Sequence, residues 1–178
     1  KAEAHCEARK IDPDAILLAR LFPDMFAFTR QVQLVTDFAK GAGARLAGIA
    51  VPSFADEEKT FAELQARIAK TIDFLGTLRK EQFADAATRT VTIKVAGNDM
   101  SFSGGEYFMG YAIPNFYFHL ATAYNILRHN GIELGKRDFM GRARRVEVSN
   151  GQACLPACPA TPCTGSPIAD TFRAITGC

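Results

Sequence analysis

The chain of 178 residues contains no tryptophan, and neither sign of charge is in excess. Its 21 Lys and Arg residues nearly balance 19 Asp and Glu residues, which leaves a formal net charge of +2. A chain this close to neutrality has no global attraction to nucleic acid or to an anionic membrane. We therefore expect neither nucleic acid nor a membrane among its partners.

Several motifs that carry chemistry are also missing. The chain has no glycine-rich phosphate loop, no serine nucleophile elbow and no HExxH zinc motif. Cysteine is scarce in the body of the chain, where Cys6 stands alone, a pattern that favours a cytoplasmic protein. The spacing of the other four lacks the paired knuckles of a zinc ribbon. These four lie near the end of the chain, at Cys154, Cys158, Cys163 and Cys178.

A run of 21 residues from Tyr107 to Leu127 contains no charged side chain. That length would suffice to cross a bilayer. One proline and three polar side chains inside the run argue against a membrane span: Pro114, Asn115, His119 and Asn125. The run instead predicts a buried helix over residues 106–131, kinked at Pro114, with Met109 in its core-facing seam.

Two other segments have the spacing of packed helices. Apolar side chains recur at steps of three and four over residues 24–46 and again over residues 60–78. The second segment starts with a capping box formed by Thr60 and Glu63. Residues 1–10 have helical character, and Asp12 followed by Pro13 favours a second short helix reaching Phe22.

A short β-hairpin is expected between the second and third long helices. Residues 90–95 read TVTIKV, which alternates polar and apolar side chains as a half-buried strand does. Residues 96–99 read AGND, a combination of glycine, asparagine and aspartate that favours a tight turn, and a second strand is expected to run back through Phe102. Val91, Ile93 and Val95 should face the helices.

The candidate functional residues are polar side chains placed among apolar ones. Asn115 and His119 are four apart, so they share one face of the most apolar helix, and Gln31 lies beside the seam of the first long helix. Three roles are compatible with His119. It is a buried imidazole hydrogen-bonded to Gln31, Asn115 or a tyrosine; it lines a ligand pocket; or it is a metal ligand. Asp37 is expected on a solvated face.

Three phrases carry a family resemblance: TRQVQLVTDFAKGAGARLAG, TFAELQARIAKTIDFL and IPNFYFHLATAYNILRHNGIELGKRDF. They resemble DUF1993, a domain of unknown function within the DinB/YfiT-like superfamily, over about Ala4 to Gly141. The resemblance implies an up-down-down-up four-helix bundle with a small β-hairpin before the last helix. It also implies that the first helix starts upstream of Lys1. Residues 1–141 would form the bundle domain, and the Cys- and Pro-rich residues 142–178 would not belong to it.

The same resemblance bears on metal binding. Many members of the superfamily bind a divalent metal through three histidines, one on the second helix and an HxxxH pair on the last. Here His119 stands at the second position of that pair, Asn115 at the first, and Gln31 near the remaining position. Amides are far weaker ligands for transition metals than imidazole is. We therefore predict no cofactor, and a zinc or nickel ion would have His119 as its remaining ligand.

The sequence thus predicts an all-α, homodimeric bundle that serves as a small-molecule-binding or structural module. Its ligand-binding candidates are Gln31, Asn115, His119 and Tyr111, and the residues do not indicate a catalytic group. The alternative is a divalent-metal-dependent transferase or hydrolase of the DinB/YfiT type that uses His119.

Overall fold

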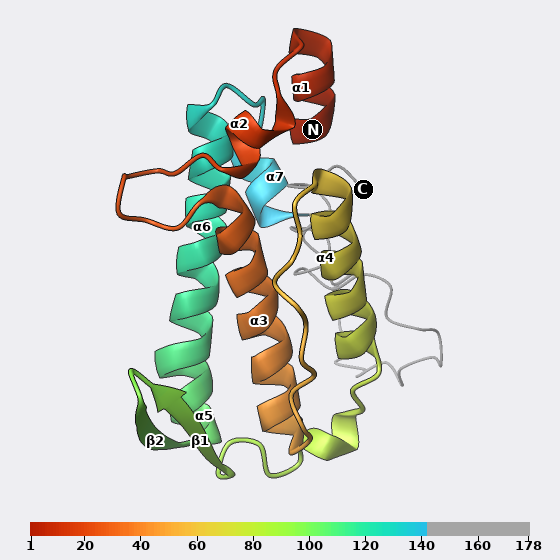
Figure 1. The fold of residues 1–178 in the computed structure, drawn as a ribbon. Coiled ribbons are helices and arrows are strands. Elements are labelled where there is room, and N and C mark those ends of the chain that lie inside the picture. The colour runs from red at the N-terminus through yellow and green to blue at the C-terminus, as the bar shows by residue number, and fades with distance from the viewer. Residues whose placement is uncertain (142–178) are drawn as a thin grey trace, which may run out of the picture.

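The structure is a computed structural model and describes residues 1–141. Three long helices lie side by side: α3 (Phe28–Ala47), α4 (Phe61–Gly76) and α6 (Ile113–His129) (Figure 1). Short helices α1 (Ala2–Arg9), α2 (Pro13–Leu17) and α7 (Lys136–Met140) gather at one end of the group. The tail predicted for residues 142–178, with its four cysteines, falls outside the described part of the chain.

Residues 1–141 are mostly helical, as expected, with one small hairpin as the exception. Beside α3, α4 and α6 the described residues contribute no fourth long helix. The four-helix arrangement therefore stays a prediction. Within these residues, no helix combines the length and apolar character needed to cross a membrane.

Two of the predicted helix starts are confirmed. Thr60 accepts a hydrogen bond from the Glu63 N–H, and the Glu63 side chain accepts from the Thr60 N–H, which completes the capping box of α4. Asp12 accepts from the Asp14 N–H and caps α2, with Pro13 as its first residue.

The segment between α2 and α3 differs from the prediction. Helix α2 ends at Leu17 instead of reaching Phe22, and α3 begins at Phe28 and not near residue 24. Residues 18–27 form a loop whose ends are joined by a hydrogen bond of 2.9 Å from the Phe28 N–H to the Ala19 carbonyl. Pro23 disfavours the helical conformation for the residue before it, which explains why the helical spacing does not produce a helix here.

The β-hairpin is confirmed, with strands β1 (Thr90–Val95) and β2 (Asn98–Ser103) paired antiparallel. Val91 and Ile93 are buried in a cluster that includes Leu46 of α3. The hairpin therefore closes one end of the helical group (Figure 1).

The predicted continuous helix over residues 106–131 is wrong in its first part. A turn of α-helix, α5 (Gly104–Glu106), leads into a π-helical segment, η2 (Tyr107–Ala112), before α6 begins. Pro114 has no N–H, so in an unbroken α-helix the carbonyl of Gly110, four residues earlier, would have no donor. In π-helical bonding each carbonyl accepts from the N–H five residues later, so the donor for Gly110 becomes the residue after the proline. The face changes accordingly: Tyr107 and Ala112, five apart, are buried, and Met109 is exposed, contrary to the expected seam.

Cys6 is buried against the end of the core that α1 and α2 cover. Burial raises the pKa of its thiol, and the nearby carboxylates of Asp12, Glu3 and Glu7 raise it further. A thiol held in its protonated form is a poor nucleophile, so Cys6 is suited to packing in the core.

Candidate functional site

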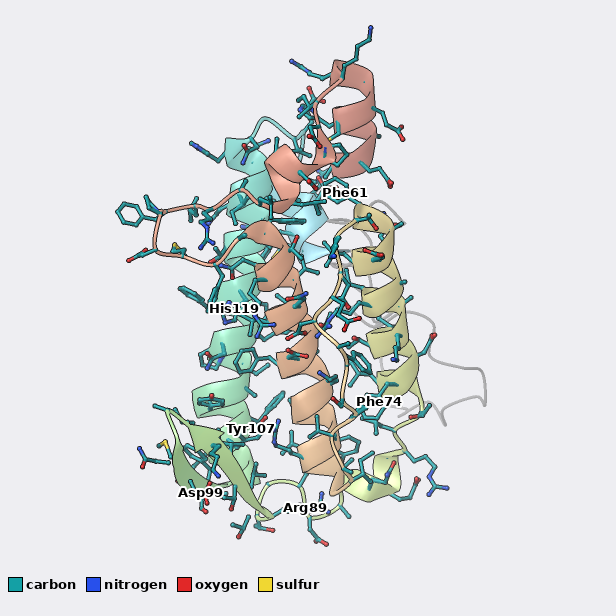
Figure 2. All side chains as sticks on the ribbon, in the orientation of Figure 1. Phe61, Phe74, Arg89, Asp99, Tyr107 and His119 are labelled. Atoms are coloured by element: carbon teal, nitrogen blue, oxygen red, sulfur yellow. The ribbon has the colours of Figure 1, made fainter. Side chains whose placement is uncertain are left out.

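The structure brings together two of the predicted site residues, Gln31 of α3 and His119 of α6. The Nδ1 atom of His119 lies 2.8 Å from Oε1 of Gln31, although the two residues are 88 positions apart in the chain. Gln31 is 1% exposed and His119 is 9% exposed. Figure 2 shows His119 at the middle of α6, beside α3. The pair therefore forms a polar bridge within the α3–α6 interface.

The orientation of the Gln31 amide is fixed by a second hydrogen bond. Its Nε2 group donates to the backbone carbonyl of Phe26, 3.0 Å away, in the loop before α3. A carbonyl can only accept, so the amide must turn its nitrogen to Phe26 and its oxygen to His119. The Gln31 oxygen can also only accept, and Nδ1 of His119 must therefore carry the proton.

This tautomer leaves Nε2 of His119 as an acceptor with a free lone pair. Burial lowers the pKa of His119 below its ordinary value of 6.5, and the positive charge of Arg30 lowers it further, so the ring is neutral at pH 7. No hydrogen bond to Nε2 is present among the described residues, and none of their buried side-chain nitrogens or oxygens lacks a partner. It follows that Nε2 reaches the surface.

Aromatic rings surround the imidazole on both sides. The Phe38 ring stacks on it, with centroids 5.6 Å apart and planes at 15°, while the Phe118 ring meets it edge-on at 5.2 Å. Phe38, which is partly buried, also lines an apolar groove of about 370 Å³ between α3 and α6. These two ring contacts and the hydrogen bond to Gln31 hold the imidazole in place.

The other two candidates, Asn115 and Tyr111, make a local pair. The Asn115 side-chain nitrogen donates to the backbone carbonyl of Tyr111 at 2.7 Å, inside the region where η2 passes into α6. The Tyr111 ring packs against Phe38 with centroids 6.0 Å apart. Asn115 thus supplies a donor to a backbone carbonyl in the turn that contains Pro114. Its amide makes no hydrogen bond to Gln31 or His119.

The family model of DUF1993, a domain of unknown function, matches residues 1–140. The chain belongs to the DUF1993 family. A crystal structure of a DinB family member protein from Shewanella denitrificans is similar to this DUF1993 chain, with a TM-score of 0.74 and 43% sequence identity. The similarity covers 82% of each chain. None of the curated proteins matches.

The residues of this DUF1993 chain do not fit the three-histidine metal site of the wider superfamily. His119 is the only imidazole at the three corresponding positions, the Gln31 oxygen is already engaged with His119, and the Asn115 amide is engaged with its own helix. Among residues 1–141, no group of three or more His, Cys, Asp or Glu side chains is placed to hold a metal ion. A donor set of one imidazole and two amides does not match the preference of zinc or nickel.

Sequence reasoning missed a second polar cluster, centred on the buried Arg67 of α4. Its guanidinium donates to Thr36 Oγ1 at 2.7 Å and to Asp37 Oδ1 at 2.8 Å on α3. Asp37, predicted on a solvated face, is 30% exposed and is therefore both partly solvated and ion-paired. It also pairs with Asp56 and Glu58 of the segment that links α3 to α4. An Arg at a core-facing helical position was the available signal, because a buried Arg needs several acceptors.

Proposed function

We propose that this DUF1993 protein binds a small molecule through Nε2 of His119. The observation that supports this is the chain of hydrogen bonds from Phe26 through Gln31 to His119, which makes Nε2 a permanent acceptor at neutral pH. A histidine whose only role was to join α3 and α6 through Gln31 would not need an accessible acceptor on its second ring nitrogen. The expected ligand carries an N–H or O–H donor.

The surroundings of His119 limit the rest of the ligand. Phe118 is exposed and meets the imidazole edge-on, so a ligand donating to Nε2 would lie against an aromatic ring. Aromatic rings favour flat or apolar partners. An aromatic alcohol or amide satisfies both conditions, because its donor reaches Nε2 and its ring packs on Phe118.

Titration of the protein, labelled with ¹⁵N-histidine, by phenol and by benzamide tests the proposal. The chain has three histidines, so each signal can be followed separately. We expect the Nε2 signal of His119 to shift saturably while those of His5 and His129 stay constant. His119→Phe should abolish the binding, and His129→Ala, a change on the exposed last turn of the same helix, should not. Signals that all move together, or that do not move, would leave His119 with only a structural role in bridging α3 and α6.

The alternative from the sequence, a metal-dependent transferase or hydrolase, has the weaker support because the donor set does not fit. Elemental analysis of untagged protein separates the two functions. We expect no stoichiometric zinc or nickel, whereas stoichiometric metal that disappears in His119→Ala would favour the metalloenzyme. We also propose that the protein folds as a four-helix bundle and is located in the cytoplasm.

A further inference from the structure

The loop of residues 18–27 holds the carbonyl that orients Gln31. Figure 1 shows this loop projecting from the helical group between α2 and α3. The carbonyl of Phe26 accepts from Nε2 of Gln31 at 3.0 Å, and Oε1 of Gln31 lies 2.8 Å from Nδ1 of His119. A backbone group outside the helices therefore decides which ring nitrogen of His119 carries the proton.

An exposed arginine fixes the peptide group next to that carbonyl. Nη1 of Arg20 donates to the carbonyl of Met25, five residues further along the chain. This carbonyl belongs to the planar peptide unit between Met25 and Phe26, so the hydrogen bond also fixes the direction in which the chain enters Phe26. A hydrogen bond from a charged donor is stronger than one between neutral groups. Arg20 is thus one of the two supports of the Phe26 carbonyl.

The second support is the start of α3. Ala27 is the N-cap residue of this helix, with an extended backbone at φ −65° and ψ 161°, and its carbonyl accepts from the Gln31 N–H at 3.0 Å. Helix α3 is 20 residues long and packs in the core, whereas the bond from Arg20 is a single exposed contact. Of the two supports, the bond from Arg20 is therefore the one that breaks more easily.

We propose that Arg20 is a positioning residue for the His119 site, and that the loop it holds decides whether Nε2 of His119 accepts or donates a hydrogen bond. The inference rests on the proposed binding function and names what controls it. With Arg20 bonded to the Met25 carbonyl, the Gln31 oxygen faces Nδ1 and Nε2 is an acceptor. In this state the site takes an aromatic ligand that carries an N–H or O–H donor.

Release of the loop has a defined chemical consequence. Once the Phe26 carbonyl moves away, the Gln31 amide can turn over and offer its N–H to the imidazole. Nδ1 of His119 then accepts, and the ring proton is transferred to Nε2 by exchange with water. Both states keep the ring neutral, so the burial that lowers the pKa of His119 is compatible with each. The released site takes an aromatic ligand with an acceptor, such as a ketone.

Arg20→Met tests this inference, because it removes the donor and leaves a side chain of similar length. We expect ¹⁵N NMR of the histidine-labelled variant to show a fraction of His119 with its proton on Nε2, a form absent from the wild type. Phenol should bind about three- to tenfold more weakly than to the wild type. Acetophenone, an aromatic ketone with an acceptor only, should bind more tightly. Arg20→Lys keeps a charged donor and should stay close to the wild type.

The matched control is Arg9→Met, which removes an exposed arginine from α1. It should leave the tautomer and the preference for phenol unchanged, and urea denaturation shows that each variant is folded. Arg20→Met protein with the wild-type tautomer would overturn the positioning role, and so would the same change of tautomer in Arg9→Met. An altered tautomer in Arg20→Met, together with wild-type protein that does not bind phenol, would refute the binding function and keep the control by Arg20.

Discussion

His119 of α6 and Gln31 of α3 form a polar bridge of 2.8 Å between two helices that also pack through buried apolar side chains. The bridge has a direction, because the Phe26 carbonyl orients the amide and the amide orients the imidazole proton. Structure and proposed function therefore depend on the same pair of side chains.

Replacing Gln31 by methionine should destabilise the protein. Met has a similar length but neither an acceptor nor a donor, so the buried His119 Nδ1–H and the part-buried Phe26 carbonyl would both lose their partner. An unpaired buried polar group costs about 1–3 kcal/mol. We expect a loss of that size in the free energy of unfolding, measured with urea. Asn125→Met on the exposed face of α6 is the control, and an equal effect of the two changes would argue against the bridge.

The stability of the protein should also depend on pH through His119. Its pKa in the folded state lies below its ordinary value of 6.5, because burial and then Arg30 disfavour the charged form. Folding therefore favours the neutral ring, so the contribution is complete above pH 6.5 and is lost as pH falls through the folded-state pKa. Urea midpoints measured across this window should fall more steeply for the wild type than for His119→Phe. Parallel curves would show that His119 is not the group responsible.

Arg67→Met should be among the most destabilising single changes. The substitution removes the cation that faces Asp37, Asp56 and Glu58, and leaves Thr36 and the Ala55 carbonyl without their donor. Removing one partner of a buried ion pair costs about 3–5 kcal/mol.

The matched control for that change is Lys70→Met on the same helix. The Lys70 ammonium lies over the Phe54 ring, 4.3 Å from its centroid, but it is exposed and is not part of the ion pairs of Arg67. We expect its cost to stay below about 1 kcal/mol. If chemical denaturation shows the two variants to be equally stable, Arg67 does not hold the segment between α3 and α4.

The sequence predicted the fold where local patterns and packing agree. The capping box at Thr60 and the alternation at Val91 and Ile93 each encode a structure that depends on few residues. The start of α3 was wrong because helical spacing continues through residues 24–27, and only the closure between Phe28 and Ala19 reveals a loop. The π-helical segment before Pro114 could not be read from periodicity, since it changes the period itself.

The candidate site could be predicted only in part, for a physical reason. The helix containing His119 identified a polar side chain on an apolar face, but its partner had to be chosen among several residues. Gln31 was one of these, and the structure selects it because the Phe26 carbonyl fixes its amide. The Arg67 cluster was missed because its carboxylates come from a segment whose path between α3 and α4 has no sequence pattern.

The most direct test of the central claim is the tautomer and charge of His119, measured by ¹⁵N NMR of histidine-labelled protein between pH 8 and pH 5. We expect a proton on Nδ1, a bare Nε2, and a pKa of His119 below the ordinary imidazole value of 6.5. Gln31→Glu should raise the pKa of His119, because a carboxylate in place of the amide favours the imidazolium. A proton found on Nε2 at neutral pH, or a charged ring at pH 7, would contradict the proposed acceptor and with it the binding function.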